Sequence, residues 1–153
     1  MQKFALASKF AQIRMLIQAC DIDAALLNNA PLTIEYFDDY NNQRIVNSFL
    51  FNYMKIQDKI GSKLFKSVLV ELRELDDDSM TMIDVLNRLE KLNFLESTQI
   101  WDELREIRNA IAHEYPTDPQ YRIDIIKLAL SGYISLKSVV DKLESACKAK
   151  RII

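Results

Sequence analysis

One short run of the chain gathers four side chains that are able to do chemistry. From residue 108 to residue 115 the sequence reads Arg-Asn-Ala-Ile-Ala-His-Glu-Tyr. The run supplies a fixed cation in Arg108, an amide in Asn109, an imidazole in His113 and a phenol in Tyr115. His113 is the only histidine of the chain, and histidine is the side chain that ordinarily changes charge near neutral pH. If the protein has a chemical site, we expect it in this run.

The spacing within the run leaves two interpretations open. On an ideal α-helix Asn109 and His113 share one face, whereas Arg108 and His113 point about 140° apart and converge only where the helix frays or bends near its end. The prolines after Tyr115 favour such an end. The alternative without chemistry is an arginine in a salt bridge, a histidine favoured by the dipole at a helix C-terminus, and a tyrosine packed under the last helix.

The rest of the sequence predicts the helices that must position this run. The chain has 153 residues, enough for one domain with a core, but only 2 glycines and 3 prolines. A sheet protein of this length would need more turn residues. Apolar residues recur at helical spacing, and the predicted helices cover about 2–28, 34–75, a short segment after residue 79, a segment from 97 or 98 to 115, and a last helix from 118.

We therefore expect an all-α fold, an up-and-down helical bundle of four main helices plus one short helix. It forms a single domain over residues 1–148, followed by a basic, frayed tail over residues 149–153. Gly61 interrupts the longest apolar stripe and predicts a bend or a close approach of another backbone. Trp101, Phe94 and Phe65 are expected in the core or in a dimer interface.

Several residues predict where helices begin and end. The acidic run 76–78 ahead of Ser79 favours a helix start, because a carboxylate stabilises the positive end of the helix dipole. Asn93 is suited to the left-handed conformation that ends a helix. Asp118 followed by Pro119 predicts the start of the last helix, with proline at its first position.

The charge of the chain bears on whether it binds nucleic acid. The net charge of −2 gives no basic footprint of a nucleic-acid binder, although a local patch is compatible with it. A row of lysines is either a track for an RNA backbone or, as we favour, a solvated face; it comprises Lys55, Lys59, Lys63 and Lys66. Asp58 beside them either joins a cleft or pairs with a lysine.

Metal and membrane signals are weak in this sequence. Cys20, Cys147 and the lone histidine make no zinc pattern, and the acidic residues show no compact metal-ligand spacing. We interpret both cysteines as reduced thiols. The sequence has no apolar run long enough to span a bilayer, and we expect a cytoplasmic protein.

The run Arg-Asn-Ala-Ile-Ala-His-Glu-Tyr resembles the signature of HEPN domains (higher eukaryote and prokaryote nucleotide-binding). That signature is an arginine, four to six residues, and a histidine, often with a polar residue after the arginine. The tyrosine two residues past the histidine is similar to the HepT-like toxins of bacteria and archaea. The motif covers eight residues, and the order of helices, with the motif before a last long helix, extends the resemblance over most of the chain.

The resemblance implies a ribonuclease toxin of a toxin–antitoxin system. Such an enzyme cuts RNA, here tRNA or mRNA, without a metal or another cofactor, and acts as a homodimer. Two copies of the motif at a two-fold axis supply two imidazoles and two guanidiniums, whereas one histidine cannot easily be acid and base at once. His113 would exchange protons, Arg108 would hold the scissile phosphate, and Asn109 would orient either the histidine or the phosphate.

The resemblance also implies a protein partner. In HepT-like proteins the tyrosine of the motif accepts AMP from a nucleotidyltransferase antitoxin, so the implied acceptor here is Tyr115. A bulky anionic group two residues from His113 would repel RNA. One alternative is a non-catalytic chain that serves only as the substrate-binding or partner subunit of a minimal nucleotidyltransferase. A further alternative is a helical dimerisation domain without a site.

Overall fold

A computed structural model describes residues 2–75, 79–113 and 118–153, and within these residues every regular element is helical. The elements are α1 (Gln2–Asn28), the 3₁₀ turn η1 (Ile34–Asp38), α2 (Tyr40–Lys59), the π-helical segment η2 (Ile60–Leu64), α3 (Phe65–Glu71), α4 (Met82–Lys91), α5 (Thr98–Ala112) and α6 (Pro119–Ala149). The predicted all-α bundle, four long helical units with one short helix, is confirmed.

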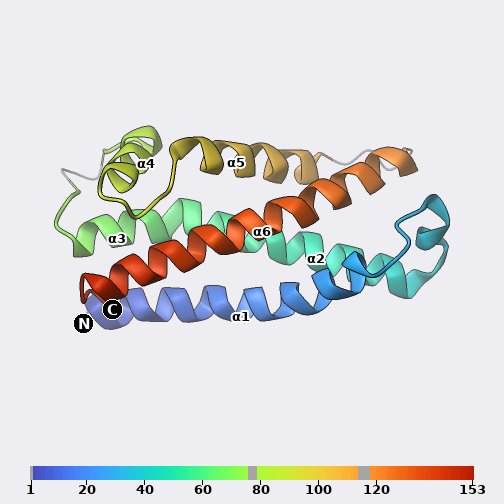
Figure 1. The fold of residues 1–153 in the computed structure, drawn as a ribbon, viewed down its shortest axis with the longest axis horizontal. Helices are drawn as coiled ribbons and strands as arrows, with labels where there is room; N and C mark the ends of the chain where they lie inside the picture. Colours follow the sequence, from blue (N-terminus) through green and yellow to red (C-terminus); the bar gives the residue numbers. More distant parts are fainter. Residues whose placement is uncertain (1, 76–78, 114–117) are drawn as a thin grey trace.

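The long helices run lengthwise through an elongated bundle (Figure 1). The helix α1 packs most extensively on α2, and α5 packs on both α6 and α2. The segments α2, η2 and α3 follow one another as a single rod, while α4 lies beside α3 at the end of the bundle where both termini lie. No helix in the described ranges is both long and apolar enough to cross a membrane.

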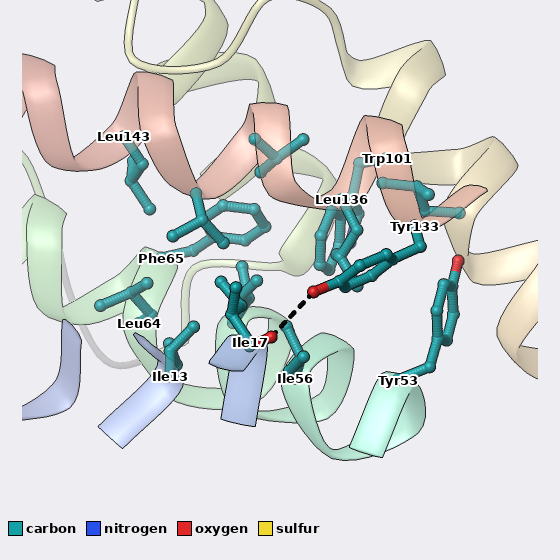
Figure 2. Packing of buried hydrophobic residues seen from close by; sticks show 14 of the residues in the cluster. Ile13, Ile17, Tyr53, Ile56, Leu64, Phe65, Trp101, Tyr133, Leu136 and Leu143 are labelled. Atoms are coloured by element: carbon teal, nitrogen blue, oxygen red, sulfur yellow. Dashed lines mark hydrogen bonds between the residues drawn. The ribbon is translucent and has the colours of Figure 1, made fainter. Parts of the chain in front are cut away.

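The apolar stripes predicted from the sequence form the core. The stripe of α1 is at most 5% exposed at each position and comprises Leu6, Phe10, Ile13, Ile17 and Cys20. Figure 2 shows how α6 closes over it, with the Tyr133 hydroxyl donating to the Ile17 carbonyl at 3.0 Å. The same hydroxyl lies 2.6 Å from a carboxylate oxygen of Asp21, so this buried polar group is satisfied.

Three large aromatic residues were predicted to lie either in the core or in a dimer interface, and the structure places them in the core. Trp101, Phe65 and Phe94 are each at most 2% exposed within the single chain. The rings of Trp101 and Phe65 meet edge to face, with centroids 4.7 Å apart. Such a pair contributes beyond the apolar area it buries, and it ties α5 to α3.

Both cysteines are free and buried. Burial raises the pKa of the Cys20 thiol and of the Cys147 thiol to about 12. Because the thiolate is the reactive form of cysteine, these two side chains behave as small apolar groups of the core, in agreement with the reduced thiols predicted.

Two predicted helix starts are wrong. The segment from Ile34 forms the separate turn η1, and α2 begins only at Tyr40, where the Asp39 carboxylate accepts from the Asn41 N–H at 2.8 Å. The helix α4 is capped by Thr81 and not by Ser79, because the Thr81 hydroxyl accepts from the Asp84 N–H. The acidic run 76–78 lies outside the described residues.

Three other predicted boundaries are confirmed. Ser97 caps α5, and its hydroxyl accepts from the Ile100 N–H at 3.2 Å. Asp118 caps α6, with Pro119 in the first turn. Asn93 takes a φ of 64° after α4, as the left-handed C-terminal position requires.

The tail differs from the frayed end predicted from its basic composition. After α6 the chain turns back at Arg151, which has a φ of 57°, and the Ile152 N–H donates to the Cys147 carbonyl at 3.1 Å. Ile152 and Ile153 are half-buried and pack against the core. Burial of these two apolar side chains stabilises the C-terminus against the core, whereas a tail of lysines and arginine alone would stay in solvent.

Gly132 allows α6 to approach its neighbours closely. A Cβ atom there would lie 2.7 Å from the Ile107 side chain and 2.9 Å from the Tyr53 hydroxyl. We expect Gly132→Ala to lower the free energy of unfolding by about 1–2 kcal/mol, since overpacking outweighs the better helix propensity of alanine. Urea unfolding followed by circular dichroism measures the change. Ser131→Ala, at an exposed position of the same turn, is the control, and an equally stable Gly132→Ala protein would contradict the close packing.

Candidate functional site

A groove of about 540 Å³ runs between α5 and the α2–η2 rod. On each side the lining positions recur at helical spacing, so each helix presents one face to the groove. The residues from α2 and η2 are Gln57, Asp58, Gly61 and Ser62, those from α5 are Trp101, Arg105, Arg108 and Asn109, and α4 adds Met82.

A glycine of η2 lies where the groove meets Trp101. Gly61 was predicted to mark a bend or a close approach of another backbone, and the structure shows a π-helical segment there and an approach by a side chain. A Cβ atom on Gly61 would lie 3.1 Å from Cζ2 of Trp101. Single π turns are frequent at functional sites, and this one forms the wall opposite Trp101.

Arg108 is held in the groove by Asp58. The guanidinium donates from Nε to Oδ1 at 3.0 Å and from Nη2 to Oδ2 at 2.9 Å. Hydrogen bonding to the Asp58 carboxylate raises the pKa of Arg108 above its ordinary value. A guanidinium has five N–H donors, so this two-pronged contact leaves three of them to bind another anion, and it fixes the plane of the group.

Asp58 is one of the residues that sequence reasoning left unassigned. It joins the cleft, as one of its two interpretations proposed, but its partner is Arg108 and not a lysine. Arg105 lies one turn before Arg108 and contacts Asp102 at 3.5 Å. In the lysine row, the ammonium of Lys55 lies 5.2 Å from the centroid of the Phe51 ring.

The lysine row itself does not line the groove. None of its four residues is among the lining residues, although all belong to the same rod. Around the helix axis, Asp58 lies between Gln57 on one side and Lys55 and Lys59 on the other, so the two lysines point away from the groove side. Lys55 and Lys63 are exposed, and Lys59 and Lys66 are half-buried. The row therefore flanks the candidate site, and its role in binding RNA stays a prediction.

His113 lies where the helix ends. It is the C-terminal cap of α5, with φ −81° and ψ 106°, and its backbone N–H donates to the Asn109 carbonyl. Its side chain is exposed and is not among the groove-lining residues. The structure thus brings Arg108 and Asn109 together in the groove and places His113 just past the last turn. Tyr115 lies outside the described residues.

Some groove residues carried no signal that we recognised in the sequence. Gln57, Ser62 and Arg105 were not singled out, although their spacing relative to Asp58 and Arg108 places them on the same helix faces. Within residues 2–75, 79–113 and 118–153 no cluster of three histidine, cysteine or acidic side chains suited to a metal ion is present.

Comparison of the chain with protein-family models, with curated proteins and with solved structures finds no match. The likeness to HEPN domains therefore rests on the eight-residue run and on the order of the helices.

Proposed function

We propose that this protein is an endoribonuclease toxin of the HepT-like type, active as a homodimer with one composite site. The observation that carries the proposal is the guanidinium of Arg108, which is oriented by the two hydrogen bonds that it donates to Asp58 and retains donors for a phosphate. Asn109 lines the same groove, and His113 follows at the end of the same helix. One helix thus carries an oriented cation and an exposed imidazole, the two kinds of group that RNA cleavage without a metal uses.

The proposed reaction transfers the phosphoryl group from the 5′-oxygen of one nucleotide to the 2′-oxygen of the nucleotide before it. One imidazole takes the proton of the ribose 2′-hydroxyl, and the 2′-oxygen attacks the adjacent phosphorus. The bond from phosphorus to the 5′-oxygen breaks, and the second imidazole of the dimer gives this oxygen its proton. The products are a 2′,3′-cyclic phosphate and a 5′-hydroxyl. Arg108 stabilises the negative charge that grows on the phosphorane oxygens, where fixed donors are most effective.

The position of His113 supports a composite site. It is exposed at the end of α5, so a second copy packed on this end would bring two imidazoles to one phosphate. The Arg108–His113 spacing on one helix does not favour a close pair within a single chain. A nucleotidyltransferase antitoxin that attaches AMP to Tyr115 would put a bulky anion next to this site and exclude RNA by charge and volume.

The nucleophile is tested with a matched pair of oligonucleotides. An RNA that the protein cuts at one position is compared with the same RNA carrying 2′-deoxyribose at that position, both in the presence of EDTA. We expect the deoxy link to resist cleavage by at least about 10²-fold, because the attacking oxygen is absent, and chelation to have no effect. Equal cleavage of both strands would show that a 2′-oxygen is not the nucleophile.

A non-catalytic subunit of a nucleotidyltransferase is the second candidate. The contact that favours it is the same ion pair, because an arginine bound to an aspartate on a neighbouring helix also serves simply to join α5 to α2. The two functions differ in cells. A ribonuclease expressed without its antitoxin should arrest growth in a manner that depends on His113, whereas a binding subunit should not.

A further inference from the structure

A buried amide without a partner lies beside the proposed site. Gln57 is 3% exposed, and neither its Nε2 nor its Oε1 has a hydrogen-bond partner among the described residues. Native proteins rarely bury such a group unpaired, because the hydrogen bonds that it made with water are lost. An apolar side chain of the same length would avoid that loss, so folding alone does not account for a glutamine here.

The surroundings of Gln57 single it out further. The other buried positions of α2 are apolar or aromatic, namely Val46, Phe49, Tyr53 and Ile56. Gln57 departs from this pattern. It lines the groove next to Asp58, and Arg108 and Asn109 of α5 line the same groove. Among the buried residues of α2, Gln57 is the one that lines this groove.

The groove has the size and polarity of a site for a single planar group. Its volume of about 540 Å³ is within the ordinary range for small-molecule sites. Its lining combines apolar positions, Trp101 and Gly61, with the polar side chains of Asn109, Ser62 and Arg108. A ligand with an aromatic body, polar edges and an attached phosphate would match this distribution.

We propose that the groove takes one nucleobase of the RNA, next to the phosphate bound by Arg108, and that Gln57 is the residue that selects the base. This inference rests on the proposed function and deepens it. A carboxamide offers one donor and one acceptor side by side, the pattern that adenine complements with its N6 amino group and a ring nitrogen. Since both amide atoms are covered in the free protein, the side chain turns toward the groove as the base enters.

The inference predicts that Gln57 lowers stability in the free protein. Gln57→Met keeps the length of the side chain and removes both unpaired atoms, so its melting temperature should rise by about 2–4 °C. Gln12→Met makes the same change at an exposed position of α1 and should shift the melting temperature by less than about 1 °C. A lower melting temperature for Gln57→Met would show that the amide supports the fold and would overturn the inference.

Binding is measured without any cleavage, through the only tryptophan of the chain. Trp101 lines the groove, so a base that enters should change its fluorescence. We expect AMP to give a saturable change and ribose 5-phosphate to give none at equal concentration. Gln57→Met should weaken AMP binding about tenfold or more, and Gln12→Met should not. Gly61→Ala, which narrows the groove without touching the amide, should weaken it too.

The failures of the two proposals are separate. RNA cleavage that requires His113 but shows no base preference, together with AMP binding that is unchanged in Gln57→Met, would overturn the role of Gln57 and leave the ribonuclease intact. Binding of AMP that depends on Gln57, in a protein that cuts no RNA, would support the base site and overturn the proposed ribonuclease.

Discussion

Replacing either Arg108 or His113 with alanine should lower the rate of RNA cleavage by about 10²-fold to 10⁴-fold and leave the fold intact. Loss of His113 removes the proposed proton transfers, which typically contribute that much to a rate. Loss of Arg108 removes a fixed cation from the phosphorane, an effect of similar size. Both side chains lie at the surface or near it, and the exposed pair of Arg108 with Asp58 contributes at most about 1 kcal/mol to stability.

Single-turnover cleavage of one RNA, followed on purified proteins, measures these effects, and circular dichroism verifies the fold. Arg105→Ala is a suitable control, because Arg105 lines the same groove from the same helix but contacts Asp102. Its loss should cost less than about tenfold. Arg108→Lys should rescue little, since an ammonium cannot keep the two-pronged contact with Asp58. Full activity of both alanine variants would remove the site assignment.

The composite site adds a sharper outcome. In a mixture of the Arg108→Ala and His113→Ala proteins, subunit exchange forms dimers that retain one guanidinium and one imidazole in the shared site. Part of the lost activity should return on mixing. If the mixture stays as inactive as its components, one guanidinium and one imidazole do not suffice for cleavage, and the expected complementation between subunits is wrong.

Helix existence followed from the sequence far better than helix ends did. Apolar spacing alone placed the buried stripe of α1, because burial of one helix face is what such a period reflects. The starts at Ile34 and Ser79 were wrong because side-chain capping is a local choice among neighbouring polar residues. Asp39 and Thr81 cap these helices through their own side chains, a few residues after the predicted starts.

The candidate site was only half visible in the sequence, for a physical reason. Arg108 and Asn109 were found because they share one short run, but Asp58 and Gln57 come from a helix some fifty residues earlier. Their pairing depends on how α2 packs against α5, which no local pattern encodes. Gln57 gave no signal of its own, because the apolar stripe continues through Ile56 and Ile60 beside it.

The largest effect on stability is expected at the residue that joins the core to the groove. Trp101 is 2% exposed, packs edge to face on Phe65, and lies so near Gly61 that a Cβ atom there would be 3.1 Å from its Cζ2. Trp101→Ala should lower the free energy of unfolding by about 3–5 kcal/mol, since it removes a large apolar side chain and leaves a cavity. For a domain whose total stability is on the order of 5–15 kcal/mol, that is a large share.

Urea unfolding followed by circular dichroism measures this loss, because the variant has no tryptophan to report it. Trp101→Phe is the matched control: a smaller ring can keep the contact with Phe65 and should lose clearly less. A change below about 1 kcal/mol in Trp101→Ala would contradict the packing of α5 on α3 and η2. The same substitution removes a side chain that lines the groove. If the base site relies on Trp101, the alanine variant should therefore lose AMP binding even at temperatures where it remains folded.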